Sequence, residues 1–382
     1  MTGRRAIPYP PVHLFPPRRM SSSSYASELP AAWSPPAPPR WIQSPAFDLF
    51  FFIGAPVVML PVVLGALYWS NAFALLGFVL AFAHYASSFT FYLWDENQAR
   101  HRARWLAFFG GPLIITAVFC ALVYFHVPLI VQVVLFFWNT VHVARQSCGI
   151  LSVYRTKAGV SDPAQKAAVN GAILTASVWL CLWNIETHPE VRPLLLAVSP
   201  RLPYLLSVLS GAVAAVALAR AVQAFRRRAQ KGAPAALPEL AVFLTGLTLF
   251  HPYLWIPDSA RATFAMLLPH YLQYLGLVWL VHRRKFTLPG GSWPQVALQR
   301  LGRSVVLLVV ALAALGLGLF VVKELLARVG YVKLFEAFYL LVAFLHYYVD
   351  GLFWAFRDPH VRRSIGPFLA GTAAVPRSES GA

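Results

Sequence analysis

Long apolar segments, each about the length of a bilayer crossing, recur along most of this chain. They are continuously hydrophobic rather than alternating, and hydrophobic residues make up 58% of the 382-residue sequence while charged residues make up 12%. A run of about 20 apolar residues matches the hydrocarbon core of a membrane, which is about 30 Å thick. Because no water satisfies the backbone there, such segments predict membrane-spanning helices. The predicted fold class is therefore all-α, a polytopic membrane helix bundle.

The apolar segments indicate about ten transmembrane helices. The loops between them are too short to hold an independent hydrophobic core, so no soluble domain is expected. We predict a transmembrane domain over residues 47–358, a disordered Pro- and Ser-rich cytoplasmic tail before it (1–46) and a flexible cytoplasmic tail after it (359–382). Met20 is an alternative start site. The predicted spans are 49–69, 72–93, 105–125, 127–150, 167–186, 203–225, 238–257, 262–282, 303–323 and 333–356.

The basic residues predict how these helices are oriented. The formal net charge is +18, and of the 32 Lys and Arg residues 24 fall in segments that lie inside if the N-terminus is cytoplasmic, against six in the outer loops. Cytoplasmic loops of membrane proteins carry this excess. Both termini are therefore predicted to be cytoplasmic, in a multi-pass protein of the inner (cytoplasmic) cell membrane. Topology and contact with anionic lipids of the bilayer explain the charge, so no nucleic-acid partner is expected.

Four of the eleven histidines differ from the rest in position. Seven lie in tails, loops or near helix ends, and among these His101 and His282 are expected to reach water or lipid headgroups. The other four lie alone near the middle of the second, fourth, eighth and tenth predicted spans. Ionisable residues inside a membrane are costly and usually functional. At similar depth on separate helices, four imidazoles are predicted to converge on one point: His84, His142, His270 and His346.

Each of these histidines has polar residues three or four positions later, on the same helix face. They are Ser87 and Ser88, Arg145 and Gln146, Gln273 and Tyr274, and Asp350.

Neutral imidazole is a good ligand for iron, zinc, copper or nickel, and the second ring nitrogen of a bound histidine usually needs an acceptor. The four histidines are therefore predicted to be metal ligands. Asp350 and Gln273 are predicted to orient imidazoles, although Asp350 is also a candidate ligand. Gln146 is predicted to line the pocket, and Arg145 to balance Asp350 or to hold a polar substrate end.

Three other interpretations of the cluster remain open. A proton or ion relay through Asp350, Arg145 and the histidines would suit a proton-coupled transporter. Two axial histidines would suffice for a single haem, whereas two haems usually need two deep histidines on one helix, which we do not expect here. Finally, each histidine would simply hydrogen-bond a neighbouring helix if the cluster is structural.

The arrangement resembles the histidine-rich integral membrane iron oxygenases of the β-carotene-cleaving dioxygenase type. The resemblance rests on His84, His142 with Gln146, His270 with Gln273, and His346 with Asp350. It implies one non-haem iron bound by four histidines, beside a long apolar substrate admitted from the bilayer. The paired-histidine boxes of di-iron membrane desaturases are absent from the sequence. We therefore expect a membrane-embedded, metal-dependent oxidoreductase or oxygenase that acts on a lipid or isoprenoid, with a transporter or a single-haem protein as alternatives.

Overall fold

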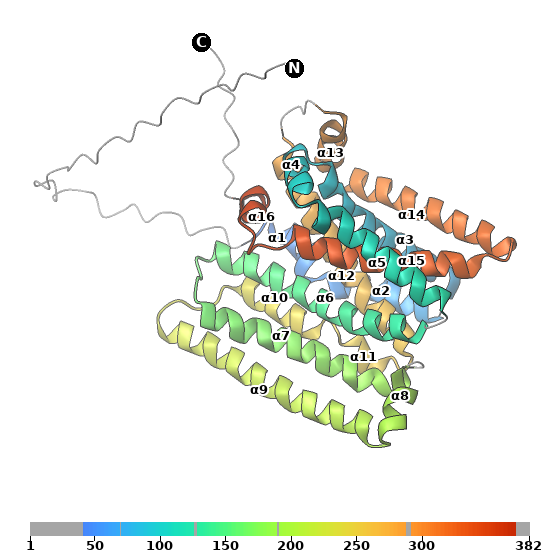
Figure 1. The fold of residues 1–382 in the computed structure, drawn as a ribbon. Coiled ribbons are helices and arrows are strands. Elements are labelled where there is room, and N and C mark those ends of the chain that lie inside the picture. The colour runs from blue at the N-terminus through green and yellow to red at the C-terminus, as the bar shows by residue number, and fades with distance from the viewer. Residues whose placement is uncertain (1–40, 69, 126–127, 189–190, 288–291, 372–382) are drawn as a thin grey trace, which may run out of the picture. The chain divides into compact units, whose positions relative to one another are not determined.

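The computed structural model describes residues 41–68, 70–125, 128–188, 191–287 and 292–371. Every regular element in these ranges is a helix (Figure 1), so the all-α class is confirmed for this part of the chain. The helices are α1 (Pro45–Asp48), η1 (Leu49–Ile53), α2 (Ala55–Tyr68), α3 (Ser70–Phe89), η2 (Thr90–Leu93), α4 (Asp95–Ala103), η3 (Leu106–Gly110), α5 (Gly111–Tyr124), α6 (Pro128–Lys157), α7 (Pro163–Trp183), η4 (Asn184–Thr187), α8 (Val191–Val198), α9 (Leu202–Gln230), α10 (Leu237–Thr248), α11 (Pro252–Trp255), α12 (Ser259–Lys285), α13 (Trp293–Arg303), α14 (Val305–Arg328), α15 (Val332–Phe353), α16 (Pro359–Ser364) and α17 (Gly366–Ala370).

Six helices in the described ranges are long and apolar enough to cross a membrane. A seventh crossing is formed if the pair Pro45–Ile53 and Ala55–Gly65, bent by 50°, counts as one span. All seven coincide with predicted spans, which supports embedding in a membrane. The six are Leu75–Leu93, Leu106–Tyr124, Pro163–Trp183, Leu202–Gln230, Ser259–Lys285 and Val305–Arg328.

The other three predicted spans correspond to α6, to α10 with α11, and to α15. With 30 and 22 residues, α6 and α15 are long enough for a bilayer core of about 30 Å at a rise of about 1.5 Å per residue. In contrast, α10 has only 12 residues and stops before the short α11. Ten crossings and two cytoplasmic termini therefore remain predictions.

Helix α12 lies at the centre of the described bundle. Of its apolar stretch 89% is buried, against 17% for η3 with α5, 11% for α9 and 17% for α14. The last three therefore lie at the outside of the described bundle. In the first predicted span, by contrast, Phe51 and Phe52 of η1 are buried and η1 packs against α12. Gly276 of α12 permits this contact, since a Cβ there would lie 2.8 Å from the side chain of Phe51.

Four helices form a closed ring of contacts in the bundle. Helix α3 packs against α12 and α15, and α6 packs against the same two helices (Figure 1). These four helices carry His84, His142, His270 and His346. The fold therefore brings distant parts of the sequence around one point.

The C-terminal segment is folded further than the sequence predicted. Residues 359–370 of the predicted flexible tail form α16 and α17. Arg284 of α12 donates a hydrogen bond to the carbonyl of Phe368 at 2.7 Å, and Lys157 of α6 donates to that of Ala370 at 3.1 Å. The predicted tails at 1–40 and 372–382 lie outside the described residues.

Candidate metal centre

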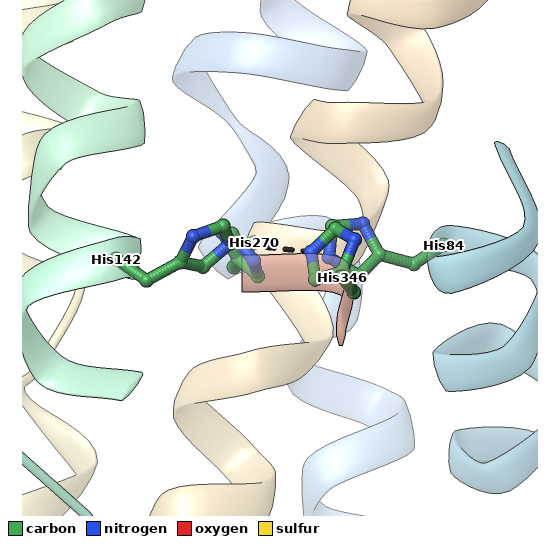
Figure 2. A group of neighbouring side chains, drawn as sticks. All are labelled: His84, His142, His270 and His346. Atoms are coloured by element: carbon green, nitrogen blue, oxygen red, sulfur yellow. Dashed lines mark hydrogen bonds between the residues drawn. The ribbon is translucent and has the colours of Figure 1, made fainter. Parts of the chain in front are cut away.

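Four histidines from α3, α6, α12 and α15 point toward one another (Figure 2). His84, His270 and His346 are fully buried, and the side chain of His142 is 10% exposed. One ring nitrogen from each lies within 4.8 Å of those of the other three. The predicted convergence is therefore confirmed, and the group could hold a metal ion.

The four rings form a quadrilateral with His84 and His142 at opposite corners. The centroid of the His84 ring is 4.2 Å from that of His346 and 4.7 Å from that of His270. The ring of His142 is 5.0 and 5.1 Å from the same two. The diagonal from His84 to His142 is 6.4 Å. This arrangement surrounds a central point rather than forming a stack.

Several nitrogens in this group have no protein partner. Both ring nitrogens of His84 and both of His270 are buried without a hydrogen bond among the described residues. An unsatisfied buried polar group costs about 1–3 kcal/mol. A metal cation at the centre would bind one nitrogen of each ring and remove part of this cost.

The closest pair of nitrogens has the spacing of metal ligands. Nε2 of His346 and Nε2 of His142 are 3.3 Å apart. Two nitrogens bound tetrahedrally at about 2.0–2.1 Å from a metal lie about 3.3–3.4 Å from each other. One nitrogen from each of the other two imidazoles lies within 4.8 Å of this pair.

Asp350 belongs to a hydrogen-bonded chain beside the histidines. It is buried on α15, four residues after His346. The hydroxyl of Tyr274 donates to Oδ1 of Asp350 at 2.6 Å and accepts the indole N–H of Trp354 at 2.9 Å. The hydroxyl of Ser88 lies 2.7 Å from that of Tyr274 and 2.8 Å from Nδ1 of His346.

With Asp350 ionised, this chain allows one arrangement of protons. The indole of Trp354 is a donor only, so Tyr274 accepts from it and gives its single proton to Asp350. Ser88 must then donate to Tyr274 and accept the N–H at Nδ1 of His346. Nε2 of His346 is therefore left with its lone pair, which a metal ligand needs.

Gln273 occupies a different place from the one predicted. It donates to the backbone carbonyl of Phe52 at 2.9 Å and accepts from Gln146 at 3.4 Å. Gln146 also donates to the backbone carbonyl of His270 at 3.0 Å. Because Gln273 contacts no ring nitrogen, the prediction that it orients an imidazole is wrong. Its amide instead joins η1 to α12, and pocket lining by Gln146 remains a prediction.

Arg145 does not pair with Asp350. Its side chain is exposed, whereas Asp350 contacts Tyr274 and lies 3.7 Å from His346 and 4.0 Å from His142. Three residues advance about 300° around an α-helix, so position 145 is offset by about 60° from position 142. At the edge of the bundle that offset turns the side chain outward, and the predicted ion pair is wrong.

The site residues to which the sequence assigned no role share one spacing. Ser88 follows His84 by four positions, and Tyr274 follows His270 by four. Trp354 follows Asp350 by four in the same way. Residues four apart lie one above the other on a helix face. This spacing alone would have selected all three partners, without any structural information.

His282 is buried although it was expected to reach water or headgroups. It lies in the last turn of α12, twelve positions after His270. Its Nε2 is 3.2 Å from the hydroxyl of Thr90, and its ring contacts Phe91 and Trp94. No described histidine ring packs against it, so the second axial ligand of a second haem is not found there.

His101 is also buried, in the polar helix α4. Its ring lies 4.4 Å from that of Phe108. Burial and the nearby charge of Arg100 lower the pKa of His101 to about 4. This imidazole is therefore neutral at physiological pH and acts as a packing group.

Comparisons with protein-family models, with curated proteins and with solved structures find no match for this chain. The site must therefore be interpreted from its own geometry.

Proposed function

We propose that this protein is a membrane-embedded, metal-dependent oxidoreductase, a non-haem iron oxygenase that acts on a lipid or isoprenoid. The observation that carries the proposal is the convergence of four buried histidines, each with a ring nitrogen within 4.8 Å of the others. Nitrogen donors favour transition metals, whereas calcium and magnesium prefer oxygen ligands. Iron is proposed because histidine-held iron with an open position activates dioxygen, a chemistry that suits the oxidation of apolar chains.

An apolar crevice on two of the helices that carry the site supports a lipophilic substrate. It has a volume of about 320 Å³ and is lined by Phe89, Tyr92, Phe108, Phe109, Pro112, Leu345 and Val349. Two of its wall residues, Leu345 and Val349, directly precede His346 and Asp350 on α15, and Phe89 directly follows Ser88 on α3. The crevice and the histidine cluster therefore share helices α3 and α15, although their side chains leave these helices about 100° apart.

Haem binding fits this geometry less well than a single ion does. A haem places its two axial ligands on opposite faces of a wide macrocycle. Here four imidazoles have nitrogens within 4.8 Å of one another. If two of them were axial ligands, the other two would occupy the space that the haem macrocycle needs.

A proton-coupled transporter is the alternative that a specific observation favours. The chain from Trp354 through Tyr274 and Ser88 to His346 is continuously hydrogen-bonded, and such chains can relay protons in membrane proteins. This alternative predicts flux in liposomes without bound metal, lost in Asp350→Asn. Iron oxygenase activity predicts no such flux.

Metal analysis of the purified full-length protein tests the proposal. After anaerobic loading with Fe²⁺ and removal of free metal, we expect about one equivalent of iron, following the one site that the four histidines form. Less than about a tenth of an equivalent of any transition metal would exclude the site. The matched control is His251→Ala, since His251 lies outside the cluster and bonds only the carbonyl of Thr248 among the described contacts. A Soret band in freshly purified protein would instead indicate haem.

A further inference from the structure

The two oxygens of the Asp350 carboxylate have different neighbours. Oδ1 accepts the proton of Tyr274 at 2.6 Å. Oδ2 lies 3.7 Å from Nε2 of His346 and 4.0 Å from Nε2 of His142. One oxygen is thus fixed by the protein, and the other faces the histidine cluster.

The three cluster-facing atoms have the dimensions of a ligand set. Nε2 of His346, Nε2 of His142 and Oδ2 of Asp350 form a triangle with edges of 3.3, 3.7 and 4.0 Å. The centre of such a triangle is about 2.1 Å from each corner, which falls within the usual metal–nitrogen and metal–oxygen bond lengths of about 2.0–2.2 Å. A single ion can therefore contact all three atoms with little movement.

Asp350 is also an acidic group without a cationic side chain beside it. It is 6% exposed, and among the described residues it contacts the hydroxyls of Tyr274 and Ser88 and the two imidazoles. A buried carboxylate is costly unless it is paired, bound to a metal or neutralised by a proton. Arg145, which the sequence predicted to balance the charge of Asp350 or to hold a polar substrate end, is exposed instead.

We infer that Asp350 is a fifth metal ligand and that Tyr274 is the positioning residue that turns its carboxylate toward the ion. This inference rests on the proposed metal binding and names the donor set of that site: four imidazoles and one carboxylate. Adding an oxygen donor favours divalent iron or manganese over copper(I), which prefers softer ligands. Five donors leave one position of an octahedron for an exogenous ligand.

Tyr274 is held for this role by groups on two other helices. Its hydroxyl accepts the indole N–H of Trp354, the C-cap residue of α15, and lies 2.7 Å from the hydroxyl of Ser88 on α3. With both of these as donors, the remaining proton of Tyr274 can go only to Asp350. Loss of the hydroxyl would free the carboxylate to rotate, without removing a ligand.

Cobalt binding to the detergent-solubilised full-length protein tests the donor set, because the visible absorption of Co²⁺ strengthens when five ligands become four. We expect Asp350→Asn to strengthen this absorption and to weaken Co²⁺ affinity by more than about 100-fold, since residues one shell further out already contribute about 10–100-fold. Tyr274→Phe should weaken it by about 10–100-fold and shift the absorption bands. Asp258→Asn, which alters a helix-capping carboxylate, is the matched control and should match the wild type.

The thermal unfolding of the metal-free proteins separates a ligand from a structural residue. Removing an unpaired buried charge should leave metal-free Asp350→Asn at least as stable as the wild type, while the metal-dependent rise in melting temperature is lost. A wild-type spectrum with affinity within about threefold in Asp350→Asn would overturn the inference and leave the four-histidine site standing. A wild-type protein that binds no Co²⁺, Fe²⁺ or Zn²⁺ would overturn both.

Discussion

Burying His84 and His270 is unfavourable unless something binds their nitrogens. Neither ring has a hydrogen-bond partner among the described residues, and both lie among apolar and aromatic side chains. A metal ion changes the balance because binding to the native state alone adds its free energy to stability. The residues that destabilise the metal-free protein would then stabilise the loaded one.

Replacement of His270 by Ala should abolish this gain. With free Fe²⁺ at about 100 times the dissociation constant, the wild type should gain about 2.7 kcal/mol in unfolding free energy. His270→Ala should gain less than about a tenth of that, because the ion loses one of its four histidine ligands and is no longer surrounded by imidazoles. Chemical unfolding with and without metal measures both. The control His251→Ala should keep the full gain, and an equal gain in His270→Ala would contradict the metal site.

Asp358 gives a prediction that does not depend on metal. Burial alone would raise the pKa of its carboxyl group, but hydrogen bonds from Arg100 and from the backbone of His360 lower it below the usual value. Arg100 approaches to 2.8 Å. A lowered folded pKa contributes stability above the unfolded pKa of about 3.9, and this contribution is lost as pH falls through the folded pKa.

We therefore expect Asp358→Asn to lower the free energy of unfolding by up to about 1 kcal/mol at neutral pH. The difference from wild type should shrink as pH falls below about 4, where the carboxylate becomes protonated. Asn still caps α16, so capping is retained. Melting temperatures across this pH range provide the measurement, with Asp258→Asn as the control. A difference that stays constant with pH would show that the ion pair contributes nothing.

For single residues, the sequence could predict which side chains form the candidate site but not the direction in which each one points. The four histidines and Asp350 were identifiable because isolated ionisable residues in apolar segments are conspicuous. Arg145 and Gln273 were misassigned because both lie three positions after a histidine, whereas the partners found at the site lie four after. That difference of about 100° around the helix axis depends on the rotation of each helix, which only packing against its neighbours sets.

Among the elements, the contact between α14 and α3 depends on one glycine. A Cβ at Gly316 would lie 2.8 Å from the backbone oxygen of Val79 and 2.9 Å from its Cα. Backbone atoms cannot move aside as a flexible side chain can. Small residues that let helix backbones approach closely are typical of membrane helix pairs.

Gly316→Ala should therefore lower the unfolding free energy by about 1–3 kcal/mol, the usual cost of overpacking. Gly318 lies two positions away on the same helix, where a Cβ would meet nothing within 4 Å. Gly318→Ala should be neutral or should stabilise by up to about 1 kcal/mol, because Ala is the better helix former. Thermal unfolding of the two variants in detergent compares them directly. Equal effects would mean that α14 does not pack against α3 in this way.

Helix boundaries could be predicted where hydropathy alone determines them. They were missed where contacts between side chains determine them. Long apolar helices such as α9 and α14 fall where the sequence placed them. The folding of α16 and α17 was missed, because it depends on hydrogen bonds from Arg284 and Lys157, basic residues that appear in the sequence only as topological signals. The break between α10 and α11 precedes Pro252, whose ring prevents helix continuation.

For the whole molecule, the open question is whether α10 and α11 together cross the bilayer. Helix α10 has 12 residues, about 18 Å at 1.5 Å per residue, which is shorter than a bilayer core of about 30 Å. The charge pattern nevertheless predicts a crossing here. The basic cluster at Arg226–Arg228 and the one at Arg283–Lys285 fall on the same side only if two crossings separate them, and α12 supplies one.

Two single-cysteine variants that flank this segment decide the matter. Ala233 precedes α10 and Ala260 is the second residue of α12, and both are exposed. If α10 and α11 cross, a membrane-impermeant maleimide added to intact cells should label Ala260→Cys and leave Ala233→Cys unlabelled until the cells are opened. Native Cys148 and Cys181 are buried, and Cys120, which is exposed on an apolar helix, should be replaced by Ser in both backgrounds. Labelling of both positions from the same side would place α10 and α11 in a re-entrant segment, reduce the number of crossings by one and put the two termini on opposite sides of the membrane.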